Sequence, residues 1–371
     1  MQADILLLSI LPTGANVLVR FSDTGNLRVL PARQHPVFLI KKEKNVMKKK
    51  ITALVMAAAM CLSVAACGSS DNGGSGDTAK DTYTVGICQL VQHQALDAAT
   101  QGFKDALKEE LGDKVEFVEQ NAANDIPTCG TICNGFVSDG VDLILANATP
   151  ALQAATAATQ SIPILGTAVT EYGVALDIDN FSGTVGGNVS GTSDLAPLDQ
   201  QAAMFSELLP DAKTVGILYC SAEPNSVYQA DVVKAALEDK GITVKVYTFA
   251  DSNDVATVTA TACDECDALY IPTDNTAASC AEAISNVALP KKTPIIAGEE
   301  GIASGCGIAT LSIDYYQLGV TTGKMAAKIL TGESDISTMP IEYYQNPVKK
   351  YNADICEQLG ITVPSDYTAI G

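Results

Sequence analysis

Hydrophobic positions from residue 82 onward alternate between two patterns that take turns along the chain. Between 96 and 111, apolar residues recur at spacings of three and four, which is typical of one face of an α-helix. Short, nearly continuous apolar runs lie between such stripes and predict buried strands. We predict strands at 83–91, 114–120, 141–146, 162–169, 214–219, 243–249, 268–272, 294–297 and 308–313. We predict helices at 96–111, 125–138, 150–159, 198–209, 226–240, 255–262, 277–287 and 316–330, with a tail at 339–344.

This alternation predicts the fold class. Continuous apolar strands that alternate with amphipathic helices indicate parallel sheets covered by helices on both faces. The pattern occurs in two consecutive sets of similar size, separated by an irregular glycine-rich stretch at 183–194. The chain is therefore predicted to be an α/β protein with two lobes. It has no glycine-rich dinucleotide motif and no P-loop lysine motif, so neither lobe is expected to bind a dinucleotide or a nucleoside triphosphate.

A second pattern precedes the folded part. The basic segment 47–50 is followed by a largely apolar run at 51–66, and Val64-Ala65-Ala66-Cys67 leads into polar residues. This order predicts a signal peptide at 47–66. The tetrad resembles the lipobox of bacterial lipoproteins, which implies acylation of Cys67 and a membrane anchor. The alternatives are an ordinary signal peptide with an incidental cysteine and, less favoured, a permanent span, for which sixteen residues are short of the roughly 20 that a bilayer needs.

The position of the signal bears on both of its neighbours. A signal peptide acts at an N-terminus, so we interpret residues 1–46 as a spurious extension from an upstream start codon. The alternative is a genuine cytoplasmic extension in which 5–11 forms a buried strand. Residues 67–81 are rich in Gly, Ser and Asp and predict a flexible tether between the lipid and the fold.

Charge excludes two classes of partner. Residues 67–371 contain 14 basic and 40 acidic residues, a formal net charge of −26. Nucleic acids and acidic membrane surfaces both require basic patches, so neither is an expected partner. All three arginines (Arg20, Arg28 and Arg33) lie before residue 47.

Cysteines and histidines give little sign of a metal or redox centre. Nine cysteines follow Cys67, an odd number, and we expect them to be mostly reduced. Cys263 and Cys266 have redox or metal-ligand spacing, but no second such pair follows. His93 is the only histidine in the predicted fold, and no nucleophile-elbow motif occurs. We therefore expect no metal, no cofactor and no enzyme activity.

Polar residues follow the predicted strands, where ligands bind in open parallel sheets. Each of them could be a helix N-cap and nothing more, but several such loops on two facing lobes favour a ligand cleft. The candidate ligand-binding residues are Gln89, His93, Thr149, Thr170, Asn225, Ser226, Asp274, Asn275 and Glu299. Thr149, Asn225, Ser226 and Asp274 are the strongest.

The ligand class follows from what these loops contain. Without an arginine, a ligand carboxylate would be held by helix N-termini and hydroxyl groups, and Asp274 or Glu299 could meet an ammonium group. This combination favours a zwitterionic amino acid. Sugar sites usually use aromatic stacking, and the chain has no tryptophan, which disfavours sugars.

Several segments in fixed order resemble a known family, over nearly all of residues 82–365. They are Val85-Gly86-Ile87-Cys88-Gln89 with His93, the run 142–150, Pro224-Asn225-Ser226 with Gln229, Thr273-Asp274-Asn275, the run 314–319 and the run 323–327. They resemble the substrate-binding lipoproteins of ABC importers, in the tryptophan/tyrosine-type family. Two positions depart from it: Gln94, where the family often has proline, and Glu171-Tyr172, where it has Asp-Pro.

The resemblance implies a type I periplasmic-binding fold, with two Rossmann-like lobes joined by a three-strand hinge. Lobe 1 would comprise 82–194 and 315–340, and lobe 2 would comprise 195–314 and 341–371, with crossings near 193–194 and at 314. The resemblance also implies an aromatic or other hydrophobic amino acid as ligand, a separately encoded permease and ATPase, and hinge closure. We expect a monomer.

Two other functions remain open from the sequence. One is an exported thiol enzyme that uses Cys263 and Cys266. The other is a sensor subunit that passes the same ligand signal to a membrane partner.

Overall fold

The computed structural model describes residues 5–8, 17–21, 27–30 and 82–371. The first three ranges are strands β1 (Ile5–Leu8), β2 (Val17–Phe21) and β3 (Leu27–Leu30), which form an antiparallel sheet. β1 lies within 5–11, the segment in which a strand is expected if residues 1–46 are a genuine extension. The predicted signal peptide at 47–66, the lipidation site Cys67 and the tether up to residue 81 lie outside the described residues.

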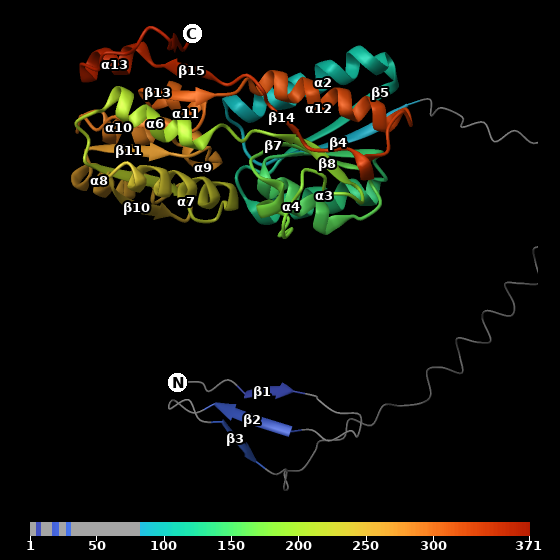
Figure 1. The fold of residues 1–371 in the computed structure, drawn as a ribbon. Coiled ribbons are helices and arrows are strands. Elements are labelled where there is room, and N and C mark those ends of the chain that lie inside the picture. The colour runs from blue at the N-terminus through green and yellow to red at the C-terminus, as the bar shows by residue number, and fades with distance from the viewer. Residues whose placement is uncertain (1–4, 9–16, 22–26, 31–81) are drawn as a thin grey trace, which may run out of the picture. The chain divides into compact units, whose positions relative to one another are not determined.

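The first lobe is built on a six-stranded, all-parallel sheet with the strand order β14-β8-β7-β6-β4-β5 (Figure 1). Its elements are β4 (Tyr83–Gln89), α2 (Gln94–Leu111), η1 (Gly112–Lys114), β5 (Val115–Asn121), α3 (Ile126–Asp139), β6 (Leu143–Asn147), α4 (Thr149–Ala158), β7 (Ile164–Val169), α5 (Tyr172–Ala175), β8 (Val189–Ser193), α12 (Tyr315–Leu330), η2 (Ile336–Thr338) and β14 (Glu342–Tyr343).

The second lobe is built on a seven-stranded sheet with the order β10-β9-β11-β12-β13-β15-β16, parallel except between β13 and β15. Its elements are α6 (Leu198–Leu208), β9 (Thr214–Cys220), α7 (Pro224–Asp239), β10 (Thr243–Phe249), α8 (Val255–Glu265), β11 (Ala268–Ile271), α9 (Asn275–Ser279), α10 (Ala281–Ala288), β12 (Ile295–Ala297), α11 (Glu300–Gly305), β13 (Ala309–Ser312), β15 (Val348–Tyr351), α13 (Ala353–Leu359) and β16 (Thr368–Ala369).

The chain crosses between the lobes three times. The crossings join β8 to α6, β13 to α12, and β14 to β15. The first follows β8, which ends at Ser193, and the second precedes α12, which begins at Tyr315. Glu342 and Tyr343 pair with β8 in the first sheet, so the first lobe extends past its predicted end at residue 340. This α/β architecture with two parallel-dominated sheets confirms the predicted fold class.

Alternating strand residues supply two cores in each lobe. In the first lobe, Val85 and Ile87 face the helices α2 and α12, whereas Cys88 packs on the side of α3 and α4. In the second lobe, one core gathers residues of α6, α7 and α13, and the other gathers residues of α8, α10 and α11. Inner strands such as β7 and β11 are therefore buried along their whole length, which explains why they are largely apolar.

The structure contains elements that were not predicted, namely α5, α11, β15, α13 and β16, and it also changes two predicted segments. The stretch 183–194, predicted to be irregular, contains the buried strand β8, whose sequence of small polar residues and glycine hides its strand character. A Cβ on Gly191 would lie 2.1 Å from the carbonyl oxygen of Gly166, so only glycine allows this close pairing with β7. The helix predicted at 277–287 is divided at Cys280 into α9 and α10.

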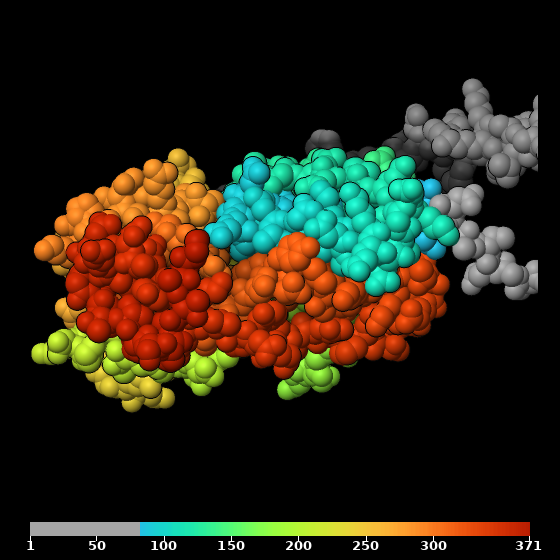
Figure 2. All heavy atoms as spheres, turned by 90° about the horizontal axis from the view of Figure 1, so that it is seen from above, coloured from blue at the N-terminus to red at the C-terminus, as the bar shows by residue number. Residues whose placement is uncertain are grey.

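Helices α2 and α12 lie side by side on the first lobe, cyan and orange in Figure 2. Glycines make this close approach possible. A Cβ added to Gly319 would lie 2.0 Å from the carbonyl oxygen of Ala99, and one added to Gly102 would lie 2.1 Å from that of Tyr316. Because α12 begins directly after a hinge crossing, this packing fixes one end of the hinge to the first lobe.

The substitution Gly319→Ala should lower the free energy of unfolding by about 1–3 kcal/mol, because the added methyl group meets rigid backbone of α2. Urea denaturation followed by circular dichroism would measure the change. Gly130→Ala in α3 is the matched control, since a Cβ there meets nothing within 4 Å and alanine should stabilise the helix by about 0.5–1 kcal/mol. Equal effects of the two substitutions would contradict the close-packing argument.

Candidate functional site

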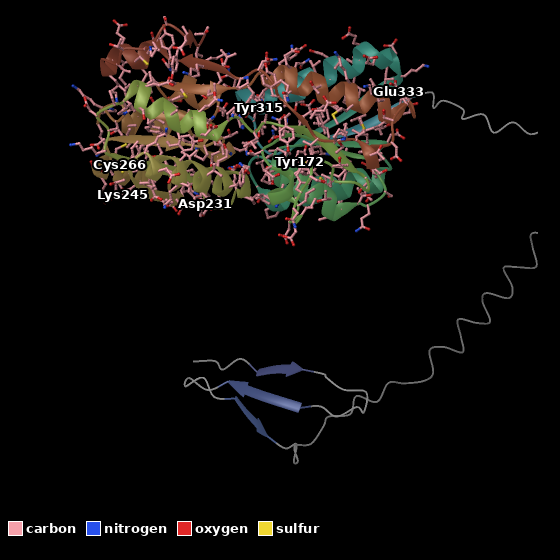
Figure 3. The ribbon with its side chains drawn as sticks, viewed as in Figure 1. Tyr172, Asp231, Lys245, Cys266, Tyr315 and Glu333 are labelled. Carbon is pink, nitrogen blue, oxygen red and sulfur yellow. The ribbon has the colours of Figure 1, made fainter. Side chains whose placement is uncertain are left out.

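A cavity lies between the two lobes, next to the hinge. Tyr315, labelled in Figure 3, is at the point where the lobes meet. The cavity is lined by His93, Ala95, Leu96, Ala168, Thr170, Asp194, Asn225, Thr273, Asp274, Asn275, Ala278, Glu299 and Tyr315. The centre of a water-sized sphere can move within about 10 Å³ of this cavity. That is room for about one water molecule.

Six of the nine predicted ligand-binding residues line this cavity. They are His93, Thr170, Asn225, Asp274, Asn275 and Glu299. The other three are buried beside it. Gln89 bonds within the first lobe, where its amide donates to Asp97 Oδ1 at 2.7 Å and accepts from Thr100 Oγ1 at 2.6 Å. Thr149 and Ser226 lie in the first turns of α4 and α7.

Hydrogen bonds join the lobes across the cleft. His93, which follows β4 in the first lobe, lies with Nε2 3.2 Å from Oδ1 of Asn275 in the second lobe. Asn124 Nδ2 donates to Thr276 Oγ1 at 3.0 Å. The lobes are therefore in direct polar contact.

Two of the predicted carboxylates cap helices. Asp274 accepts bonds from the backbone N–H groups of Ala277 and Cys220, both at 2.7 Å, and Glu299 accepts from those of Gly301 and Ile302. Burial raises the pKa of both side chains, and for Asp274 the nearby carboxylate of Glu223 adds to the rise. Their oxygens are already engaged within the second lobe.

Asp194 is a cavity carboxylate that the sequence analysis placed only at the hinge. It follows β8, the strand that the hydrophobic pattern did not reveal. Tyr315 Oη donates to its Oδ2 at 3.1 Å, while its Oδ1 is buried without a partner. Burial raises the pKa of Asp194 from 3.8 to about 6, and the hydroxyls of Thr170 and Tyr315 only partly oppose this rise.

Three buried atoms around the cavity have no hydrogen-bond partner in the described structure. They are His93 Nδ1, Asp194 Oδ1 and Asn225 Oδ1. Buried polar atoms are rarely left unpaired, because an unpaired atom loses its bond to water without replacement. Because three such atoms belong to residues that line one cavity, this cavity is the candidate site for a polar ligand group.

The cysteine pair proposed for redox chemistry lies elsewhere. Cys263 is buried in α8, and Cys266 is the C-cap of that helix. Burial raises the pKa of both thiols, which disfavours the reactive thiolate. The nine cysteines of the described residues are all unpaired.

Two parallel-sheet lobes, joined by three crossings and facing a small closed cavity, define a solute receptor of the type I periplasmic-binding class. The family described as ABC transporter substrate binding protein matches residues 84–369. The chain belongs to this family and is the substrate-binding component of an ABC transporter. In the described part of the chain, no helix is long and apolar enough to span a membrane.

Known proteins resemble the chain over most of its length. A tyrosine-binding protein of Clostridioides difficile is 37% identical over 79% of this chain and 87% of its own. The structure of an ABC domain in complex with L-Trp from Streptococcus pneumonia is 32% identical, with a TM-score of 0.75, over 78% of this chain and 100% of its own.

A third relative has been solved in an open form without ligand. The ligand-free, open structure of a substrate-binding protein with adhesive properties from Clostridium difficile is 38% identical over 78% of this chain and 99% of its own, with a TM-score of 0.60. In this chain the hydrogen bonds between the lobes indicate a closed arrangement.

The substitution Asp194→Asn should stabilise the ligand-free protein in a pH-dependent way. A folded-state pKa of about 6, raised from 3.8, means that the wild type loses stability as the pH rises between these values. Asparagine does not titrate, so the variant should be more stable by up to about 3 kcal/mol near neutral pH and by little at about pH 4.

Urea denaturation at both pH values measures this difference. Asp211→Asn, at an exposed position of the second lobe, is the control and should show no such pH dependence. A difference between Asp194→Asn and wild type that is the same at both pH values would contradict the burial of an ionisable Asp194.

Proposed function

We propose that the protein binds an amino-acid-like ligand in the cavity between its lobes, with the ligand's ammonium group on Asp194. The set of unpartnered atoms, His93 Nδ1, Asp194 Oδ1 and Asn225 Oδ1, carries this proposal. Asp194 supplies a carboxylate, and no lysine or arginine lines the cavity to neutralise it. A cation that donates hydrogen bonds fits such a site, and an ammonium group donates three.

The ligand carboxylate would lie at the N-terminus of α2. Ala95 and Leu96, in the first turn of this 18-residue helix, line the cavity, and no side chain caps the helix. The first N–H groups of a helix have no intrahelical partner and carry a partial positive charge. They offer a ligand carboxylate the donors that an arginine would otherwise supply.

The remaining cavity wall favours a hydrophobic side chain. Leu96, Ala168 and Ala278 contribute apolar surface. The relatives named for tyrosine binding and solved with L-Trp support an aromatic amino acid. The departures at Gln94 and Glu171-Tyr172 adjoin the lining residues Ala95 and Thr170 in the sequence.

Entry of the ligand requires the lobes to separate. The closed cavity has room for about one water molecule, far less than an amino acid occupies. Separation would break the bonds His93–Asn275 and Asn124–Thr276, and the three crossings would act as the hinge. Ligand binding would then favour a closed form wide enough for it.

Cys67 would tether this receptor to the outer face of the cell membrane. The lipobox-like tetrad and the polar stretch up to residue 81 support a lipid anchor and a flexible link. A tethered monomer would deliver its ligand to the permease and ATPase. Use of the same ligand as a signal to a membrane sensor is the alternative role, and the cavity itself serves both.

L-Tryptophan or L-tyrosine should raise the melting temperature of the protein, because a ligand that binds only the folded state stabilises it by about 2.7 kcal/mol at a hundredfold excess over Kd. A thermal-shift panel of amino acids, nucleosides and sugars measures this. Tryptamine and indolepropionate, which lack the carboxylate and the amine respectively, should each shift the melting temperature less. The amino-acid proposal is lost if only nucleosides or sugars raise the melting temperature.

Replacing Cys67 with serine should move the exported protein from the membrane fraction to the soluble fraction, because stable anchoring depends on acyl chains. Fractionation of a bacterial host followed by immunoblotting measures the distribution. Cys61→Ser, within the predicted signal peptide, is the matched control and should leave the protein on the membrane. Equal membrane retention of both variants would exclude Cys67 as the lipidation site.

A further inference from the structure

Glu223, the residue before α7, has a central place behind the cavity wall. It is 2% exposed, and no lysine or arginine of the described chain forms an ion pair with it. It accepts hydrogen bonds from Asn275 N, Asn275 Nδ2, Thr276 N, Thr276 Oγ1 and Asn225 Nδ2, at 3.0, 2.6, 2.9, 2.8 and 3.3 Å. Amides and a hydroxyl thus replace a cation as its partners.

These bonds fix the orientation of two asparagine side chains. Each of the two oxygens of Glu223 accepts from a backbone N–H group, of Asn275 and Thr276, and so acts as an acceptor. Both asparagines therefore turn their NH₂ groups toward Glu223. Their oxygens consequently point away from it. For Asn225 the carbonyl oxygen of Thr273 accepts from the same NH₂ group at 3.0 Å and supports this orientation. For Asn275, Glu223 is the only partner of Nδ2 in the described structure.

The orientation of Asn275 sets the tautomer of His93. Asn275 Oδ1 can only accept, so His93 Nε2, 3.2 Å away, must carry the proton of this bond. In a neutral imidazole, Nδ1 is then unprotonated and can only accept. His93 Nδ1 is one of the three unpartnered atoms at the cavity, and the other two, on Asp194 and Asn225, are oxygens that accept.

We propose that Glu223 is a positioning residue that makes the cavity selective for a primary ammonium group, acting through Asn275 on the tautomer of His93. This inference rests on the proposed function and names the residue that sets the polarity of that site. The lining residues offer three unpartnered acceptor atoms, as many as an ammonium group has N–H bonds. If Asn275 were flipped, its NH₂ group would donate to His93 Nε2, and the proton of the neutral imidazole would lie on Nδ1. The N–H group at Nδ1 would then repel one N–H bond of the ammonium group.

The His93 tautomer can be observed directly in the full chain. NMR of isotope-labelled imidazole nitrogens distinguishes the two neutral tautomers. It is recorded at about pH 8, which is above the pKa of about 6.5 of an ordinary imidazole. The chain has two histidines, and His35→Gln assigns the signals. The wild type should show His93 protonated at Nε2. A proton on Nδ1 overturns the proposal, with or without a known ligand.

Two variants test whether Glu223 acts through Asn275. In Glu223→Gln an N–H group replaces one acceptor, which removes the single preferred orientation of the network. In Asn275→Leu the bond to His93 is lost while Glu223 remains. Each should yield a mixture of His93 tautomers, and Glu223→Gln should add no further change in the Asn275→Leu background, since residues that act in series are not additive. Glu282→Gln, exposed on α10, is the control and should leave the tautomer unchanged.

Ligand selectivity gives a second measurement by titration calorimetry. The wild type should bind L-tryptophan more tightly than indolepropionate, and Glu223→Gln should reduce this affinity ratio about 10- to 100-fold, as expected for one lost bond to a charged group. An unchanged ratio together with an unchanged tautomer overturns the role of Glu223. Failure of the wild type to bind L-tryptophan, with His93 protonated at Nε2, counts against the proposed ligand and supports the network.

Discussion

The structure depends on burying acidic side chains that hydrogen bonds, and not lysine or arginine, stabilise. Asp194, Glu223, Asp274 and Glu299 are all buried around the cleft, and none forms an ion pair with lysine or arginine in the described chain. Buried carboxylates are costly unless hydrogen bonds satisfy them. Here helix N-termini, amides and hydroxyls do so for three of them. Asp194 keeps one oxygen unsatisfied, so the remaining cost is concentrated where a ligand can remove it.

This constraint links recognition to closure. When the lobes meet, Asp194 is enclosed and its ionised form is disfavoured, which the rise of its pKa to about 6 expresses. A cationic group on Oδ1 offsets that cost only in the closed arrangement, where water is excluded. A ligand shifts a conformational equilibrium by its difference in affinity between the two states. An ammonium group supplies such a difference here, whereas a neutral ligand leaves the carboxylate unsatisfied.

Much of the fold was predictable, and the site only in outline. Apolar runs such as 143–146 predict parallel sheets, and the ends of those strands predict where a ligand would bind. Whether a side chain faces the cavity depends on the direction in which it leaves the backbone, and hydrophobic patterns do not encode that direction. Gln89 was therefore predicted together with residues that line the cavity, although it bonds within the first lobe. Asp194 was predicted only as part of the hinge and not as a residue of the cavity. The reason is that the preceding strand β8 consists largely of small polar residues, which show no strand pattern. The role of Glu223 depends on hydrogen bonds between residues about 50 positions apart.

The absence of arginine after residue 33 first suggested that no guanidinium group holds the ligand carboxylate. In the proposed site, however, the amine of the ligand contributes more to selectivity than its carboxylate. The N-terminus of α2 offers backbone donors to any anion, with little dependence on the rest of the ligand. The acceptor groups are more demanding, because they belong to His93 of the first lobe, Asn225 of the second lobe and Asp194 at the hinge, so they depend on how the lobes are placed. One carboxylate, Glu223, fixes the direction of two amides, and Asn275 transmits that polarity to His93 across the cleft. In the proposed site, selectivity for an amine would therefore be a property of the closed receptor, and neither lobe would have it alone.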